Sequence, residues 1–193
     1  MTPLHPTHLQ RRRLLAGACA AACGALPVIA VANGVNPPAE LASTLAGASL
    51  TGSTRMRFFG LNVYDARLWT LPRFQPAVYW QHPLALELTY LRSLGGEAIA
   101  QRSLDEMRRN GPIPPDTAAL WLRTMSGAFP DVASGDRITG LHTPSTGARF
   151  WHNGQLRATI PDPEFSRLFF GIWLSEKTSE PRLRAELLSG LTP

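Results

Sequence analysis

Hydrophobic and polar residues alternate along several short segments of the chain, and this period of two predicts the strands of a half-buried sheet. Residues 54–69 are dense in aromatic and branched side chains, which suit such a sheet. Residues 77–80 predict a further short strand, after a break at Pro72 and Pro76. In residues 84–91 the apolar side chains fall on one face of the expected strand: Leu84, Leu86, Leu88 and Tyr90.

Two more strands are expected nearer the C-terminus, over residues 136–142 and 148–160. The second contains Asn153-Gly154, the dipeptide that most strongly indicates a type I′ hairpin turn. Asp136 is expected to bond nearby backbone N–H groups, and Arg137 to cover the edge of the sheet. These segments complete a predicted antiparallel sheet.

Between the two groups of strands the hydrophobic pattern changes to a helical period. Residues 97–110 predict a helix that Gly111 ends, because glycine commonly follows the last helical turn. Its charged residues are expected on a solvated face: Asp105, Glu106, Arg108 and Arg109. Residues 117–129 predict a second helix, with Asp116 as its cap.

A third helix begins with Asp162 as the cap and Pro163 at the first helical position. Apolar side chains cover nearly its whole surface and are expected to be buried: Phe165, Phe169, Ile172 and Trp173. A last helix begins at Pro181 and ends before Gly190. This order of elements indicates an α+β fold with an antiparallel sheet covered on one face by helices.

The first 32 residues predict an export signal of the twin-arginine type. Residues 11–13 are arginines, two leucines follow them, and residues 14–32 carry no charge. The segment ends in a small-x-small pattern at Ala30 and Ala32. A basic start, an apolar middle and a small-residue end are the three parts of a secretory signal. We therefore expect cleavage near Ala32 and a periplasmic or secreted protein.

Three other interpretations of this segment stay open. The main one is a Sec signal with a basic start. A retained membrane anchor is disfavoured because the glycines and Pro27 make a poor membrane span. A lipoprotein is disfavoured because no leucine stands three residues before Cys19 or Cys23.

Removal of the leader changes the composition of what remains. Cys19 and Cys23 are the only cysteines, so the remainder would have no disulfide, no thiolate catalysis and no Cys-ligated metal. The net charge of +5 falls to +2, with 16 basic and 14 acidic residues, and no nucleic-acid partner is expected. Residues 33–43 predict a flexible lead-in, and residues 44–193 a single domain. We expect no membrane span, metal or cofactor in that domain.

Three parts of the chain resemble the chalcone isomerase family, in particular its exported bacterial branch. Residues 57–69 resemble an early sheet segment of the family, with Val-Tyr followed by a small residue. Residues 129–137 resemble the region after its helical layer. The Asn-Gly turn, with residues 169–174 and 181–184, resembles its terminal hairpin and two helices. The resemblance implies an open-faced β-sandwich in which an apolar ligand cleft lies between the sheet and the helices.

The resemblance also locates the catalytic groups of true chalcone isomerases. The family's arginine corresponds to residues 46–48, where this chain has Ala-Gly-Ala and no arginine. A threonine of the family falls near Phe59, and its tyrosine corresponds to Ala98 or Ile99. Since apolar side chains cannot stabilise an oxyanion, chalcone cyclisation is not expected. The plant fatty-acid-binding members hold a carboxylate with the same arginine and tyrosine, so that role is not carried over directly.

Polar residues on or beside the strands that should floor the cleft are candidate ligand contacts: Arg57, Tyr64, Arg67, Tyr90 and Arg92. An arginine at the mouth of an apolar pocket can hold a carboxylate through two hydrogen bonds. The alternative is that the tyrosines are core residues and the arginines are solvated. His82, His142 and His152 have no partner at metal-ligand spacing and are expected at ordinary surface or loop positions.

These features predict an exported domain that binds a small apolar or amphipathic ligand in the cleft and lacks chalcone cyclisation activity. Two alternatives stay open. The first is an intramolecular lyase or isomerase that acts on a phenolic or other unsaturated compound with replaced catalytic groups. The second is an interaction module of the cell envelope, in which side chains fill the cleft.

Overall fold

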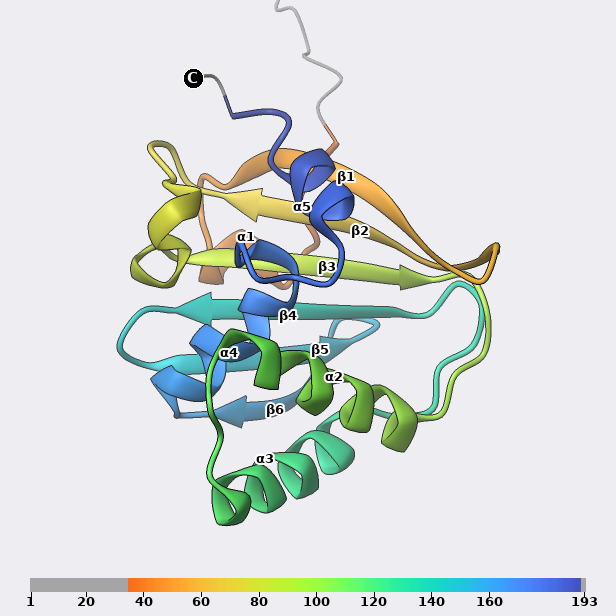
Figure 1. Ribbon diagram of the computed structural model, residues 1–193. Coiled ribbons are helices and arrows are strands. Elements are labelled where there is room, and N and C mark those ends of the chain that lie inside the picture. The colour runs from red at the N-terminus through yellow and green to blue at the C-terminus, as the bar shows by residue number, and fades with distance from the viewer. Residues whose placement is uncertain (1–34, 192–193) are drawn as a thin grey trace, which may run out of the picture. The chain divides into compact units, whose positions relative to one another are not determined.

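A computed structural model describes residues 35–191, with a six-stranded sheet at their centre (Figure 1). The strands are β1 (Ser49–Phe58), β2 (Leu61–Thr70), β3 (Leu84–Tyr90), β4 (Arg137–Thr143), β5 (Gly147–His152) and β6 (Gln155–Ile160). They follow one another across the sheet in chain order, and every neighbouring pair is antiparallel. The predicted leader, residues 1–32, lies outside the described residues.

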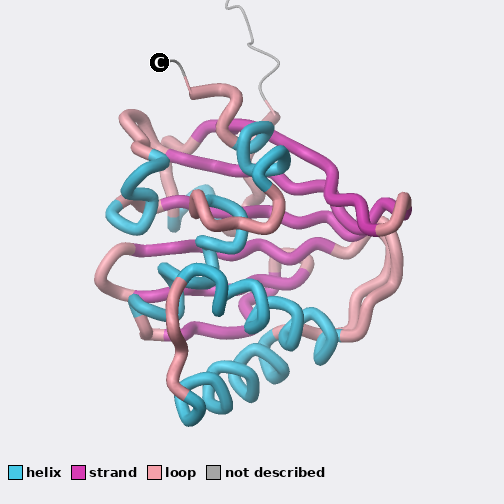
Figure 2. The backbone as a smooth tube through the Cα atoms, viewed as in Figure 1, coloured by secondary structure: helices cyan, strands magenta, loops and turns pink. Residues whose placement is uncertain are grey.

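Helices cover one face of this sheet, as both ribbon and tube views show (Figures 1 and 2). They are α2 (Gly96–Asn110), α3 (Pro115–Ala128), α4 (Pro163–Leu174) and α5 (Pro181–Leu187). A one-turn helix, α1 (Leu41–Thr44), packs on the opposite face, and a 3-10 helix, η1 (Pro76–Gln81), connects β2 to β3. The α+β class and the helix-covered antiparallel sheet are therefore confirmed.

The main core lies between the sheet and the covering helices. Leu68, Leu86 and Ile138 point into it, because the side chains of a strand alternate between its two faces. The helix α4 buries its aromatic side chains there: Phe165, Phe169, Phe170 and Trp173. Burial of one such side chain contributes about 1.5–3 kcal/mol. Ile172, expected to be buried with them, is only partly buried.

A second, smaller core lies on the opposite face of the sheet. It consists of Leu41, Leu45, Trp69, Ala85, Leu141 and Trp151. Beside α1, the carboxylate of Glu40 accepts hydrogen bonds from Arg137 Nη2 at 3.0 Å and Thr139 Oγ1 at 2.7 Å. The predicted lead-in of residues 33–43 is therefore too long, because Glu40 and Leu41 belong to the packed fold. Arg137 holds this segment on the sheet instead of covering a sheet edge.

Two local predictions are corrected by the structure. Residues 77–80 belong to η1 rather than to a strand, because Pro76 lies at its start, where the fixed φ of proline suits a helical turn. Asp116 does not cap α3, since the cap residue is Pro114. Asp116 instead lies in the first turn, where its charge faces the positive end of the helix dipole.

Other local predictions are confirmed. The carboxylate of Asp162 accepts hydrogen bonds from two backbone N–H groups in the first turn of α4, at 2.9 and 3.0 Å. Asn153 and Gly154 have φ values of 49° and 83°, as the central residues of a type I′ turn require. Asp136 accepts a hydrogen bond of 2.7 Å from the backbone N–H of Ala133.

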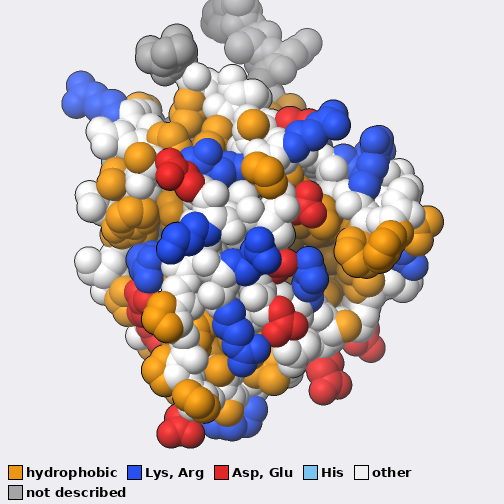
Figure 3. All heavy atoms as spheres, in the orientation of Figure 1, with side chains coloured by type: hydrophobic (Ala, Val, Ile, Leu, Met, Phe, Trp, Pro, Cys, Tyr) orange, Lys and Arg blue, Asp and Glu red, His pale blue; other side chains and the backbone are white. Residues whose placement is uncertain are grey.

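The hairpin of β1 and β2 ends in exposed apolar side chains. The exposed fractions of Phe58, Phe59 and Leu61 are 51%, 91% and 54%. Figure 3 shows hydrophobic side chains gathered at the right-hand side of the molecule, where this hairpin ends in Figure 1. Phe59 and Gly60 form the two-residue turn, with φ values of 48° and 79°. We call residues 58–61 the hairpin tip.

Candidate ligand cavity

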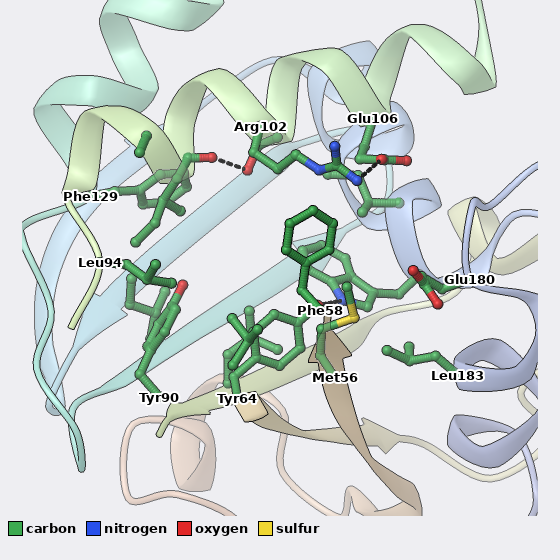
Figure 4. A pocket seen from close by; sticks show the side chains of 18 of the residues that line it. Met56, Phe58, Tyr64, Tyr90, Leu94, Arg102, Glu106, Phe129, Glu180 and Leu183 are labelled. Carbon is green, nitrogen blue, oxygen red and sulfur yellow. Dashed lines mark hydrogen bonds and ion pairs between the residues drawn. The ribbon is translucent and has the colours of Figure 1, made fainter. Parts of the chain in front are cut away.

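An apolar cavity of about 290 Å³ lies between the sheet and the helices (Figure 4). Side chains of β1 to β4 form its floor, α2 forms one wall, and α4 with the start of α5 forms the other. Its apolar lining includes Leu88, Phe129, Ile138, Phe169, Ile172 and Leu183. Ligand pockets have volumes of about 300–1,000 Å³, so this cavity lies just below the lower limit of that range. The expected cleft is present and is not filled by side chains.

Tyr64 stands on the cavity floor and is connected to α4. The indole Nε1 of Trp173 donates a hydrogen bond of 3.0 Å to the hydroxyl oxygen of Tyr64. Burial raises the pKa of Tyr64 to about 12, although the hydrogen bond from Trp173 acts in the opposite direction. Within the described part of the chain, the O–H of Tyr64 has no acceptor of its own. This proton is therefore available to a ligand.

Tyr90 lies beside Tyr64 on the neighbouring strand, with ring centroids 6.0 Å apart in an edge-to-face arrangement. Its hydroxyl points along the cavity toward Leu94 (Figure 4) and makes no hydrogen bond with residues 35–191. Burial, and then the neighbouring Tyr64, raise the pKa of Tyr90. Both hydroxyl groups therefore stay protonated near pH 7, so each can donate a hydrogen bond to a ligand and neither is a base.

An ion pair lines the α2 wall. Arg102 Nη2 lies 2.7 Å from Oε1 of Glu106, one helical turn further on. The other carboxylate oxygen of Glu106 lies 3.7 Å from Nε of Arg109 and accepts no hydrogen bond within the described residues. An arginine has five N–H donors, so Arg102 keeps donors for a second anion. Glu106 was expected on a solvated face, but it is buried, because α4 packs against α2.

The cavity brings together three of the candidate ligand contacts: Tyr64, Tyr90 and Arg92. Arg92 follows β3 and is exposed at the mouth of the cavity. Phe58 also lines the mouth, so the hairpin tip borders the opening (Figure 4). A cation and an aromatic ring therefore flank the entrance to an apolar interior.

The other two candidates, Arg57 and Arg67, lie outside the cavity. Arg67 points to the opposite face of the sheet, where its Nη1 lies 3.3 Å from the buried carboxylate of Glu87. This follows from strand geometry, because side chains an odd number of positions apart along a strand, such as Tyr64 and Arg67, point to opposite faces of the sheet. Arg57 lines a separate groove between β1 and α5, and its Nε donates a hydrogen bond of 3.1 Å to Asn62 Oδ1.

Sequence reasoning missed several lining residues, including Phe58, Arg102 and Glu106. The i, i+4 spacing of Arg102 and Glu106 indicated an ion pair, but it equally suits a solvated helix face. Ala98 and Ile99, onto which the resemblance placed the family's tyrosine, also line the cavity. They bring neither a hydroxyl nor a charge to it.

His142 is buried and bonded within the core, contrary to the surface or loop position expected for it. Its Nδ1 lies 2.6 Å from Ser166 Oγ, and its Nε2 lies 3.0 Å from the carbonyl oxygen of Trp80. Burial lowers the pKa of His142. It does not line the cavity, and its two ring nitrogens connect β4 to α4 and η1.

Residues 35–191 contain no group of three or more His, Cys, Asp or Glu side chains that could hold a metal ion. In the same part of the chain, no helix is long and apolar enough to cross a membrane. The cavity offers a ligand apolar surface and two tyrosine hydroxyl groups, with arginines and the carboxylates of Glu106 and Glu180 around them.

Comparison with known structures shows a related fold. The fold is similar to that of a fatty-acid binding protein from Arabidopsis thaliana, with a TM-score of 0.57 and 12% identity, over 74% of this chain and 87% of that one. At so low an identity, this likeness shows the fold alone.

Sequence comparison extends the likeness to a family. An uncharacterized protein of Haemophilus influenzae is 27% identical over 108 residues, which are 56% of this chain and 52% of that protein. The chain thus matches about half the length of that curated relative. A model of the chalcone isomerase-like family matches residues 31–189. Since this match covers most of the chain, the resemblance noted in the sequence is confirmed, and the chain belongs to the chalcone isomerase-like family.

Proposed function

We propose that the protein binds a small amphipathic molecule of the fatty-acid class in the cavity between the sheet and the helices. The observation that carries this proposal is an apolar cavity of about 290 Å³ with two tyrosine hydroxyls inside it and arginines near its mouth. The similarity in fold to a protein described as a fatty-acid binding protein supports the same class of ligand.

The lining suggests how such a ligand would lie. An acyl chain would contact Leu88, Ile138 and Phe169, and each buried methylene group contributes about 0.8 kcal/mol. Its carboxylate would lie toward Arg92 and Arg102, because an unpaired charge is costly in an apolar interior. The hydroxyl groups inside the cavity can donate hydrogen bonds to the same carboxylate or to a polar group along the chain.

The geometry of the cavity supports chalcone cyclisation less well than it supports ligand binding. The positions matched to the family's arginine and tyrosine carry no such groups, and the nearest tyrosines have raised pKa values. A neutral tyrosine can donate a hydrogen bond but cannot accept a proton as a general base near pH 7. We therefore propose a binding protein without cyclisation activity.

A pure interaction module is also less well supported. An interaction module of this kind would have side chains that fill the space between the sheet and the helices. That space is instead a cavity open to a ligand. Ligand binding accounts for the volume, whereas an interaction module does not require it.

We further propose that the domain is exported and acts in the periplasm or outside the cell. The arginines of residues 11–13, the uncharged residues 14–32 and the small residues before position 33 support this location. The match to the family model begins at residue 31, beside the expected cleavage site.

The proposal is tested on protein purified from its own cells. Native mass spectrometry, followed by extraction with organic solvent, should show one bound amphiphile of the fatty-acid class per chain. A bound molecule of another chemical class would contradict a ligand of the fatty-acid class. Turnover of a chalcone by the native protein, lost in a Tyr64→Phe variant, would favour the isomerase and contradict a binding role without catalysis.

A further inference from the structure

The hairpin tip exposes more apolar surface than its place in the fold requires. Phe58, Phe59 and Leu61 are each more than half exposed, and the rings of the two phenylalanines lie in contact, with centroids 4.5 Å apart. Folding alone does not favour such an arrangement, because removal of apolar surface from water stabilises a fold. A cluster of this kind on a protein surface indicates a partner.

The turn at the tip has nearly the same backbone conformation as the β5–β6 turn, but its sequence suits that conformation less well. The β5–β6 turn has φ values of 49° and 83° at Asn153 and Gly154, and the β1–β2 turn has 48° and 79° at Phe59 and Gly60. Asparagine tolerates the left-handed conformation, whereas a bulky side chain there is an outlier with a cost. The chain thus places a 91% exposed phenylalanine where turn geometry favours asparagine.

The tip also lies beside the cavity mouth and between two basic residues. Phe58 borders the cavity, Arg57 precedes it, and Arg92 lines the mouth from the end of β3. Among residues 35–191, neither arginine forms an ion pair. Residues 57–62 contain no acidic side chain. Figure 3 shows Lys and Arg side chains next to the hydrophobic patch at this end of the molecule.

From these observations we propose that the hairpin tip docks on the surface of an anionic lipid bilayer. Phe59 and Leu61 enter the boundary between headgroups and acyl chains, and Phe58 follows at the rim of the cavity. Arg57 and Arg92 lie at the depth of the headgroups, where they attract anionic lipids. The cavity mouth then opens at the bilayer surface.

Two features favour a bilayer over a protein partner. Apolar side chains at the tip, with cations behind them that form no ion pair among residues 35–191, match the layered chemistry of an anionic membrane surface. The apolar interior of the cavity is also continuous with the tip through Phe58, so a lipid-like molecule could pass between bilayer and cavity without crossing water. Docking does not itself depend on the proposed ligand, so it should persist in a variant whose cavity is blocked.

Hydrogen exchange of the full chain, with and without vesicles, tests the proposal at the tip itself. Peptides that cover residues 57–62 should become protected with vesicles of phosphatidylcholine mixed with phosphatidylglycerol. Pure phosphatidylcholine should give much weaker protection, and added salt should reduce the protection, because surface charges are screened. Because exchange is read peptide by peptide, contacts that residues 1–34 make with the vesicles do not mimic this result.

Phe59→Asn is the sharpest variant, because it separates docking from folding. Asparagine suits the turn, so the variant should be at least as thermostable as the native protein, yet its vesicle partitioning should fall about tenfold or more. Leu156→Asn is the control, since Leu156 on β6 is another exposed apolar side chain, at 56%, but lies away from the tip. It should dock normally. Arg92→Gln should weaken docking about fivefold, and only on anionic vesicles.

Three outcomes would overturn the proposal. The first is unchanged exchange at residues 57–62 when vesicles are present. The second is equal partitioning of the Phe59→Asn and Leu156→Asn variants. The third is protection of residues 57–62 in concentrated protein without lipid, which would assign the tip to contact between copies of the chain. If an Ala98→Trp variant binds no fatty acid but still docks on vesicles, docking does not depend on the proposed ligand.

Discussion

The indole nitrogen of Trp173 donates a hydrogen bond of 3.0 Å to the hydroxyl oxygen of Tyr64, and this bond joins α4 to the floor of the cavity. The neighbouring Tyr90 lacks any such bond within the described residues. The two tyrosines therefore present similar hydroxyl groups to a ligand, but only one of them supports the fold.

This difference predicts opposite behaviour for two matched variants. Tyr64→Phe leaves the buried N–H of Trp173 without an acceptor, and the free energy of unfolding should fall by about 1–3 kcal/mol. Tyr90→Phe removes a hydroxyl that has no hydrogen-bond partner among residues 35–191 and should change stability by less than about 0.5 kcal/mol. Chemical denaturation measures both. Equal losses of stability would contradict the assigned roles.

The alkaline titration of the protein follows from the same burial. All three tyrosines, Tyr64, Tyr79 and Tyr90, have raised pKa values, mainly because burial disfavours the phenolate. The native protein should therefore show almost no tyrosinate absorbance at pH 10, where the unfolded chain is about half ionised.

Stability should decline in the same pH range. A folded pKa above the unfolded value means that the unfolded chain loses protons first, so the stabilisation is complete below about pH 10 and is lost as the pH rises toward 12. For Tyr64 alone the loss amounts to about 2 kcal/mol at pH 12. A native protein that gains tyrosinate absorbance at pH 10 without unfolding would contradict this burial.

The packing of α5 on β1 depends on a glycine. A Cβ atom at Gly52 would overlap the backbone carbonyl oxygens of Glu186 and Leu187, so α5 would have to move away from the strand. Gly52→Ala should lower the free energy of unfolding by about 1–3 kcal/mol and increase hydrogen exchange in α5. Gly127→Ala is the control, because Gly127 on α3 has open space around it and alanine suits a helix. That change should leave stability equal or slightly higher.

The sheet and its helices could be predicted from the sequence because the residue patterns that indicate them are local. The Asn153-Gly154 turn, the Asp162 cap and the alternation along residues 84–90 each fix a neighbouring backbone conformation. The tip turn carried no such signal, because Phe59 is a poor turn residue. Its position became clear only from the pairing of β1 with β2.

The cavity was only partly predictable. Tyr64 and Tyr90 could be placed on its floor because strand alternation sets which side chains share a face. Arg102 and Glu106 could not, since a helix face looks the same in sequence whether it meets solvent or a cavity. The packed position of Glu40 likewise depends on Arg137, 97 residues away along the chain, and no local pattern reports such a contact.

The proposed export route has a direct test in the native cell. Replacement of Arg11 and Arg12 by lysine should stop export if the twin-arginine route is used, whereas a Sec substrate would tolerate the change. N-terminal sequencing of the exported wild-type protein should show a start near Asn33. An intact Met1 in a protein found only in the cytoplasm would contradict export.

The central claim, that the cavity binds an amphiphile of the fatty-acid class, is tested most directly by calorimetric titration of the full chain with a long-chain fatty acid. We expect one saturable site per chain and a negative heat-capacity change from the burial of apolar surface. Ala98→Trp, which places a ring at the cavity lining, should abolish binding, whereas Leu120→Trp, on the exposed side of α3, should leave it unchanged. Absence of saturable binding, or equal binding by the two tryptophan variants, would contradict the account.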